Sequence, residues 1–232
     1  MKKLLFIINP MAGRQQAQTD LYKMVKIFAD HDYEVTVYPT RARLDCTRKV
    51  LEDAGRFDLV VCCGGDGTLN EMVSGMMQRQ DRRPMGYIPL GSTNDLAVSL
   101  RLPTRVEEAA LRAVTGNEFH MDVGTLNDRY FNYIAAFGAF TETSYATPQE
   151  IKNALGHLAY ILEGVKSLGK ILPIHVKITA DDEQFEEDYL FGAVTNTISL
   201  GGVLKLDPEK VLLDDGMYEL LLVKNPTNAL EA

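Results

Sequence analysis

The sequence predicts an α/β fold: an N-terminal parallel α/β domain followed by a C-terminal β-rich, sandwich-like domain. Short apolar runs alternate with helical patterns up to about residue 115, which is the rhythm of a parallel sheet with crossover helices. Strand-like runs separated by turns follow Gly116. The 232 residues, 46% of them hydrophobic, can bury a core for one large domain or two small ones. We expect two domains, at residues 1–118 and 119–232.

The first half contains four regularly spaced strand candidates. A continuous apolar run predicts a strand at residues 3–8, of the kind expected in a parallel sheet covered on both faces, and similar short runs predict strands at residues 34–38, 59–63 and 85–89. Helical patterns precede the second, third and fourth of these runs. The loops after such strands lie at the carboxyl edge of the sheet, where ligands of open α/β sheets bind.

The second half is predicted to be mainly antiparallel. Strand-like runs lie at residues 119–126, 129–137, 174–180, 185–194 and 217–223. One helix interrupts them at residues 149–168, where apolar side chains recur at helical spacing.

Composition limits the classes of function and location. The net charge of −8 argues against a broadly basic surface for nucleic acid. No apolar stretch approaches the ~20 residues that span a bilayer, so contact with lipid should be peripheral. The N-terminal apolar run ends at Asn9 and Pro10, too early for a signal-peptide core, and we expect a cytoplasmic protein. The cysteines Cys46, Cys62 and Cys63 match no disulfide or metal spacing and are expected in the core.

The most informative segment follows the third predicted strand. Its residues are Gly64, Gly65, Asp66, Gly67, Thr68, Leu69, Asn70 and Glu71. Three glycines in four positions let the backbone approach a ligand closely. A helical pattern begins directly afterwards, and amide groups at a helix N-terminus favour a phosphate. Asp66 would repel that anion, so it indicates an intervening metal ion, a water or hydroxyl partner, or a chemical role.

Three other loops are weaker candidates. Residues 9–14 contain one glycine and, taken alone, fit an ordinary strand-to-helix turn. Residues 90–96 can be a helix start, because Ser, Thr, Asn and Asp all cap helices, or a second wall of a nucleotide site beside the glycine segment. The sequence Asp214, Asp215, Gly216 is most simply a turn, although its carboxylates can also hold a divalent cation.

The glycine segment and the Pro-Leu-Gly-Ser-Thr-Asn-Asp run at residues 89–95 together resemble the diacylglycerol kinase catalytic domain, in particular the bacterial lipid kinases. Residues 9–13, 155–160 and 213–216 also match, so the resemblance covers essentially the whole chain. Gly-Gly-Asp-Gly alone also occurs in NAD kinases and phosphofructokinases. The following Leu69, Asn70 and Glu71 and the Gly-Ser-Thr-Asn-Asp run favour the lipid branch.

The resemblance implies ATP bound in a cleft between the two domains and a magnesium-dependent lipid kinase of phospholipid biosynthesis. The γ-phosphate would pass to a lipid hydroxyl at a membrane surface, with diacylglycerol giving phosphatidic acid. Asp66 would link the nucleotide to Mg²⁺ and act in catalysis. The residues implied to contact ATP are Asn9, Pro10, Met11, Ala12, Gly13, Thr40, Gly65, Asp66, Gly67, Thr68, Leu69, Asn70, Glu71, Ser92, Thr93 and Asn94. A structural Mg²⁺ is implied on Asp215 and the carbonyl groups of Leu212 and Met217.

The sequence departs from the family in one respect. The family's general base lies in an Asp-Gly-Glu segment several strands beyond the acidic turn, and the sequence stops at Ala232 without one. We therefore expect either a truncated form of the kinase or a nucleotide-binding remnant without turnover. The missing segment would leave an open strand edge that favours self-association, such as a homodimer. A kinase of soluble substrates, of the NAD kinase type, remains an alternative that the phosphorylated product would distinguish.

Overall fold

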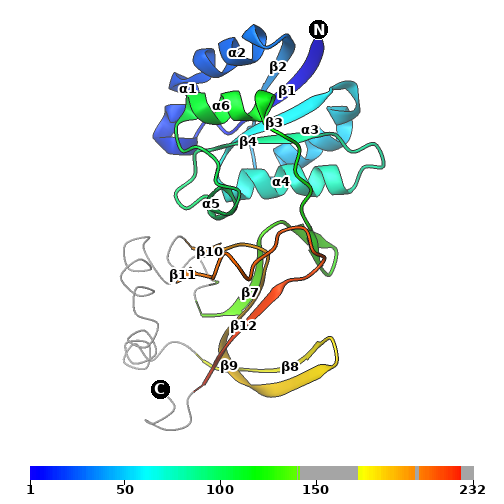
Figure 1. The fold of residues 1–232 in the computed structure, drawn as a ribbon, viewed down its shortest axis with the longest axis vertical. Helices are drawn as coiled ribbons and strands as arrows, with labels where there is room; N and C mark the ends of the chain where they lie inside the picture. Colours follow the sequence, from blue (N-terminus) through cyan, green and yellow to red (C-terminus); the bar gives the residue numbers. More distant parts are fainter. Residues whose placement is uncertain (140, 142–171, 202–203, 226–232) are drawn as a thin grey trace. The chain divides into compact units, whose positions relative to one another are not determined.

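The computed structural model describes residues 1–139, 141, 172–201 and 204–225. The chain divides into two compact units, Met1–Tyr133 and Ile134–Ala232 (Figure 1). The first is an α/β unit with a parallel sheet and the second is rich in antiparallel strands, which confirms the predicted fold class. The domain division predicted at residue 118 lies within the first of these units and stays a prediction.

The first unit alternates strands and helices up to its last helix and ends in a short hairpin. Its strands are β1 (Lys2–Ile8), β2 (Tyr33–Pro39), β3 (Leu59–Gly64), β4 (Met85–Pro89), β5 (Gly124–Leu126) and β6 (Arg129–Phe131). Its helices are α1 (Gln16–Thr19), α2 (Leu21–Asp30), α3 (Asp45–Asp53), α4 (Asp66–Met77), α5 (Asp95–Ser99) and α6 (Val106–Thr115), with 3-10 turns at Ala12–Gln15 and Ala54–Arg56.

The first four strands form a parallel sheet in the order β2-β1-β3-β4. Alternate residues of the central strand β1 face opposite helical layers. Phe6 packs in the layer of α2 and α6, whereas Leu5 and Ile7 pack in the layer of α3, α4 and α5. Figure 1 shows these two groups of helices on opposite sides of the sheet. A sheet covered on both faces explains why the central strands β1 and β3 contain continuous buried apolar runs, whereas the edge strand β2 is only partly buried.

The three cysteines are free and buried, as predicted. Cys62 and Cys63 are adjacent on β3 and face opposite layers of the core. Burial raises the pKa of the Cys63 thiol to about 12. These thiols are therefore small apolar core groups.

The second unit contains an antiparallel sheet built around the long strand β9. Its strands are β7 (Ile134–Gly138), β8 (Ile174–Ala180), β9 (Glu183–Thr195), β10 (Ser199–Leu200), β11 (Leu204–Lys205) and β12 (Glu219–Lys224). The first half of β9 pairs with β8, and its second half pairs with β7 and β12. Strands β10 and β11 form a separate antiparallel pair.

Two predicted strands differ from the observed ones. The run at 119–126 is a strand only at Gly124–Leu126, although Met121 and Val123 do pack against the core beside α3 and α4. The run at 129–137 is split: β6 pairs with β5 in the first unit, and β7 pairs with β9 in the second. Both pieces are strands, so the strand-like run gave no sign of the break between them. The predicted helix at 149–168 lies outside the described residues.

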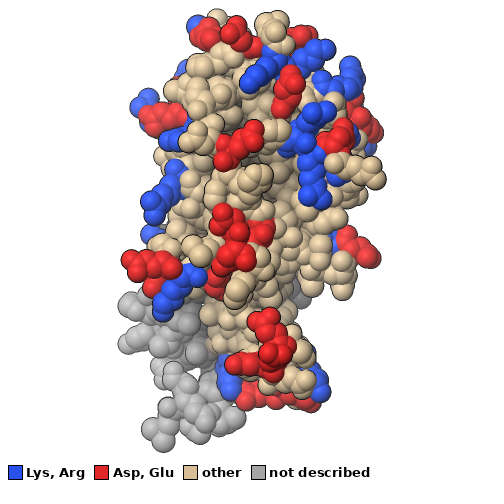
Figure 2. All heavy atoms as spheres, turned by 45° about the vertical axis from the view of Figure 1, so that its right-hand side comes forward, with Lys and Arg blue, Asp and Glu red and all other residues tan. Residues whose placement is uncertain are grey.

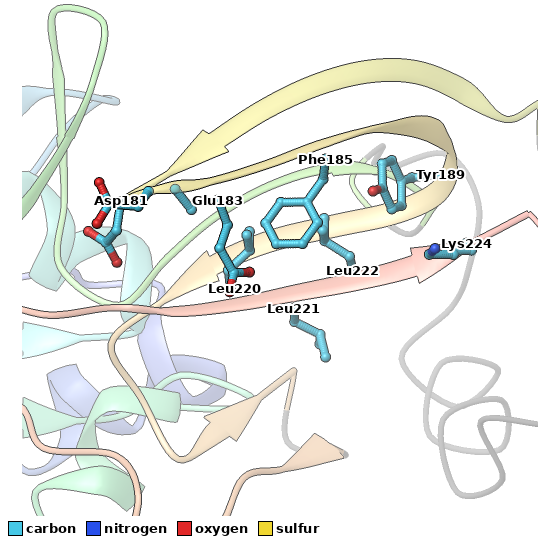
Figure 3. A pocket seen from close by; sticks show the side chains of 10 residues that line it. Asp181, Glu183, Phe185, Tyr189, Leu220, Leu221, Leu222 and Lys224 are labelled. Carbon is cyan, nitrogen blue, oxygen red and sulfur yellow. The ribbon is translucent and has the colours of Figure 1, made fainter.

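A groove lies within the second unit, between the β8–β9 hairpin and β12. It has a volume of about 770 Å³ (Figure 3). Apolar side chains including Phe185 and Leu222 point into it, with Lys224 toward one end and Asp181 toward the other. None of the residues predicted to bind ATP lines this groove.

Charged side chains of both signs are interspersed on the face of the α/β unit that Figure 2 shows. Many are paired along helices, for example Lys26 with Asp30 at 2.5 Å and Lys49 with Asp53 at 2.5 Å. The Lys26–Asp30 pair is exposed and contributes little stability, whereas the Lys49–Asp53 pair is half-buried. Among the described residues, no helix is long and apolar enough to cross a lipid bilayer.

Candidate functional site

The glycine segment forms the turn between β3 and α4. Strand β3 is buried and ends at Gly64, Gly65 has an extended backbone, and α4 begins at Asp66. The Gly65 carbonyl accepts the Leu69 N–H at 3.1 Å, so the helix begins directly after β3. The first amides of α4 therefore lie at the carboxyl edge of the parallel sheet. Unpaired amides and the helix dipole together favour an anion at this edge.

The neighbouring loop after β4 packs directly against this turn. The Leu90 N–H donates to the Gly64 carbonyl at 2.7 Å. A Cβ atom on Gly65 would lie 3.1 Å from the Gly91 Cα, and one on Gly91 would lie 2.6 Å from the Gly65 Cα. The two backbones can approach this closely only because both positions are glycine.

Asp66 connects the two loops through one of its carboxylate oxygens. Oδ2 accepts the Thr93 hydroxyl at 3.0 Å and the Asn94 N–H at 2.9 Å. Oδ1 is buried and has no hydrogen-bond partner among the described residues. Burial raises the pKa of this carboxyl; the Thr93 hydrogen bond opposes the rise, and the charge of Asp95 adds to it.

A second orphaned oxygen lies one helical turn away. Asn70 Oδ1 is also buried without a partner among the described residues, while its Nδ2 contacts the Tyr130 carbonyl at 3.5 Å. Residues four apart on a helix share a face, so Asp66 and Asn70 offer two oxygen acceptors on one side of α4. Carboxylate and amide oxygens suit Mg²⁺ and its bound waters, so these residues fit the predicted ion.

Asn94 shapes the loop that carries Ser92 and Thr93. Its Oδ1 accepts the Gly91 N–H at 2.7 Å and the Tyr87 hydroxyl at 3.1 Å, and its Nδ2 donates to the Gly91 carbonyl at 2.9 Å. Its φ of 53° is in the left-handed region. Asn94 precedes α5 but makes no side-chain capping bond to it. The capping interpretation therefore does not describe what this side chain does.

Asn9 joins the first loop to the glycine turn. Its N–H donates to the Cys63 carbonyl at 2.9 Å, and its Nδ2 contacts Thr68 Oγ1 at 3.4 Å. Its Oδ1 accepts the Met11 N–H at 3.0 Å, and Gly13 has a φ of 60°. The loop at residues 9–13 is thus folded against the start of α4, which its single glycine did not indicate.

The loop after β2 meets the same helix. The Thr40 N–H donates to the Ile8 carbonyl at 2.9 Å, next to Asn9. At the far end of this loop, the Leu44 N–H donates to Glu71 Oε1 at 2.9 Å. The ATP-site residues predicted in the first unit therefore lie on four loops at the carboxyl ends of β1 to β4 and on the first turns of α4.

Two residues absent from the predicted set support these loops. Asp45 is buried and accepts the Arg41 N–H at 2.9 Å, the Tyr38 hydroxyl at 3.1 Å and a hydrogen bond from Arg48. Tyr87 holds Asn94 from β4. Carboxylates are common at the start of helices because they cap them. The sequence therefore did not single out Asp45 as a residue that supports these loops.

The predicted acidic turn lies in the second unit, before β12. Asp215 Oδ1 accepts the Met217 N–H at 2.9 Å, and Gly216 has a φ of 77°, so the segment is a turn as predicted. Leu212 and Asp215 are exposed. Glu219 Oε2 is buried without a partner among the described residues. In the described part of the chain no group of three or more His, Cys, Asp or Glu side chains could hold a metal, and the structural Mg²⁺ stays a prediction.

Comparison with known proteins identifies the family. The model of the diacylglycerol kinase catalytic domain matches residues 3–126, which contain all four loops. This chain belongs to the diacylglycerol kinase family. The diacylglycerol kinase of Bacillus subtilis is 37% identical over 226 residues, which are 97% of this chain and 74% of that protein. The diacylglycerol kinase of Staphylococcus saprophyticus is 32% identical, covering 96% of this chain and 73% of that protein.

Solved structures of the diacylglycerol kinase family agree with the fold. A crystal structure of a diacylglycerol kinase from Bacillus anthracis is similar with a TM-score of 0.76 at 30% identity, over 97% of this chain and 74% of that one. The resemblance of residues 155–160 to diacylglycerol kinases lies outside the described residues.

Proposed function

We propose that this protein is an ATP- and Mg²⁺-dependent lipid kinase that transfers the γ-phosphate of ATP to a lipid hydroxyl, most simply that of diacylglycerol. The observation that carries the proposal is the Asp66 carboxylate, whose Oδ1 is buried and unpaired beside the glycine turn at the N-terminus of α4. Membership of the diacylglycerol kinase family supports the reaction class.

The proposed ATP site consists of the four loops and the first turns of α4. The amides of Asp66, Gly67 and Thr68 would bind phosphate oxygens, and Asn9 would hold the first loop against them. The residues proposed to line the site are Asn9, Pro10, Met11, Ala12, Gly13, Thr40, Gly65, Asp66, Gly67, Thr68, Leu69, Asn70, Ser92, Thr93 and Asn94, and Glu71 lies next to them on α4.

Asp66 and Asn70 would hold Mg²⁺ or its waters, and the ion would neutralise charge on the transferred phosphoryl group. Thr93 and the Asn94 amide hold Asp66 Oδ2, and the buried Oδ1 has no partner among the described residues, so it would be available to the ion. Positioning by these residues supplies much of the catalysis in this class of reaction. The acceptor lipid would be reached at a membrane surface.

Phosphate transfer from labelled ATP to diacylglycerol in mixed micelles tests the proposal. The assay compares this chain with a version extended to the full length of the relatives, and each with its Asp66→Ala variant. We expect labelled phosphatidic acid when the protein without the substitution is given Mg²⁺, and none from the Asp66→Ala variants. Label on NAD instead of lipid would replace the proposal with the soluble-substrate alternative. ATP binding without transfer in either version would indicate a nucleotide-binding protein.

A further inference from the structure

Glu71 is hydrogen-bonded through both its side chain and its backbone to the segment that follows β2. Its Oε1 accepts the Leu44 N–H at 2.9 Å, and its backbone carbonyl accepts the Thr47 hydroxyl at 2.8 Å. The side-chain contact joins residues that lie 27 positions apart in the sequence. One residue of α4 therefore fixes both the end of the 40–44 loop and the first turn of α3.

Leu44 has a backbone conformation that is unfavourable for leucine. Its φ is 65°, in the left-handed region, where a Cβ atom crowds the backbone. Its side chain is 59% exposed, so burial does not compensate for the conformation. The bond from its N–H to Glu71 is a tertiary contact that holds this residue in place, and its carbonyl accepts the Arg48 N–H at 3.0 Å at the start of α3.

Hydrogen bonds also hold the beginning of the loop. The Asp45 carboxylate accepts the Arg41 N–H at 2.9 Å, and Thr40 is bonded to Ile8 at the end of β1. Arg43, between these anchors, is exposed and makes no ion pair or side-chain hydrogen bond with the described residues. The loop thus presents Thr40 and Arg43 at the carboxyl edge of the sheet in one fixed arrangement.

We propose that Glu71 is a positioning residue: it holds the 40–44 loop in its nucleotide-binding arrangement through the Leu44 N–H, instead of contacting the nucleotide. This inference rests on the proposed function and refines the role of one residue of that site. Its carboxylate acts as a hydrogen-bond acceptor, and its charge is not required. When Glu71 is removed, Leu44 leaves the left-handed region and the loop is seldom in the arrangement that binds.

Removing the Glu71 side chain should weaken ATP binding, and a second substitution at Leu44 should restore it. If the loop is correctly arranged about a tenth of the time in Glu71→Ala, the dissociation constant for ATP rises about tenfold. Glu71→Gln keeps an acceptor oxygen and should bind like the wild type. Leu44→Gly removes the penalty for positive φ, so Glu71→Ala with Leu44→Gly should recover most of the affinity.

Calorimetric titration of the whole chain with ATP and Mg²⁺ tests the proposal without requiring turnover. The variants are Glu71→Ala, Glu71→Gln and the double variant with Leu44→Gly. Thr47→Val is the matched control, because it removes the contact to the Glu71 carbonyl and leaves the Leu44 bond intact. We expect weakened binding only in Glu71→Ala, with thermal unfolding reporting any general loss of stability.

Three results would overturn the proposal. Equal loss of affinity in Glu71→Gln and Glu71→Ala, with no recovery from Leu44→Gly, would mean that the carboxylate touches the ligand itself. Unchanged affinity in Glu71→Ala would mean that the contact serves stability alone. A wild-type chain that binds no ATP would refute the proposed function, and with it any role of Glu71 in nucleotide affinity.

Discussion

Gly65 and Gly91 are in direct backbone contact: a Cβ atom on Gly91 would lie 2.6 Å from the Gly65 Cα. Each residue follows a strand of the parallel sheet, and the contact sets the spacing between the glycine turn and the loop that carries Thr93. Asp66 and Thr93 can meet at 3.0 Å because these two backbones are so close.

The first prediction concerns this contact. Gly91→Ala should push the two loops apart and lower the free energy of unfolding by about 1–3 kcal/mol. Gly67→Ala is the matched control for stability, because a Cβ atom there would meet nothing within 4 Å beyond its chain neighbours and the backbone of its own helix, and alanine favours a helix. Urea denaturation measures both. Equal stability of Gly91→Ala and the wild type would show that the loops can separate without cost.

Asp66 should make the protein less stable as the pH rises. Its pKa is raised above 3.8, first by burial, so the native carboxyl holds its proton more tightly than the unfolded one. The unfolding free energy should therefore fall as the pH rises from about 3.8 through the raised pKa. Asp66→Asn should remove this fall when both proteins are measured with EDTA. A constant difference between them at every pH would contradict the prediction.

Asp45 should have the opposite pH dependence. Hydrogen bonding to Arg48 is the main cause that lowers its pKa from 3.8 to about 2. Its stabilising contribution is therefore present above pH 3.8 and is lost as the pH falls toward 2. Asp45→Asn should lower the unfolding free energy by about 1–3 kcal/mol at neutral pH, and by less near pH 2. Glu52→Gln, which affects an exposed partner of the same Arg48, should change it by less than about 0.5 kcal/mol.

His175 should titrate above its usual range. The ring lies opposite Asp188 on the β8–β9 hairpin, with Nδ1 2.8 Å from Oδ1, and this contact is the main cause that raises the His175 pKa above 6.5. The resulting small stabilisation is present below pH 6.5 and is lost as the pH rises through the raised value. NMR titration of the ring protons measures the pKa directly. Asp188→Asn should lower it more than Glu186→Gln does, because Glu186 is 3.8 Å away.

The sequence predicted the sheet and the order of its loops because both depend on short-range patterns. Short apolar-rich runs identified β1 to β4, and glycines followed by a helical pattern identified the start of α4 near Asp66. Long-range contacts had no such signal. Nothing in the sequence paired Glu71 with Leu44, or indicated that Leu44 adopts a positive φ, because leucine rarely does so.

The boundary between the units could not be predicted from the sequence for a related reason. A run of aromatic and apolar residues indicates that a strand is packed in a sheet, but not which sheet it belongs to. Residues 129–137 therefore looked like one strand, whereas β6 and β7 belong to different units. Asn94 is a similar case, since its residue type suggests a cap and its side chain instead closes a loop.

The central position of β1 has a consequence for synthesis on the ribosome. Leu4 pairs with Val35 on one side and with Leu59 on the other, so β1, which is made before both of its neighbours, cannot complete its hydrogen bonds until β3 has emerged. At about 5–20 residues per second, that delay is roughly 3–11 s. During this interval a strand that is apolar from Leu4 to Ile8 has an open edge, which is a template for pairing with another chain.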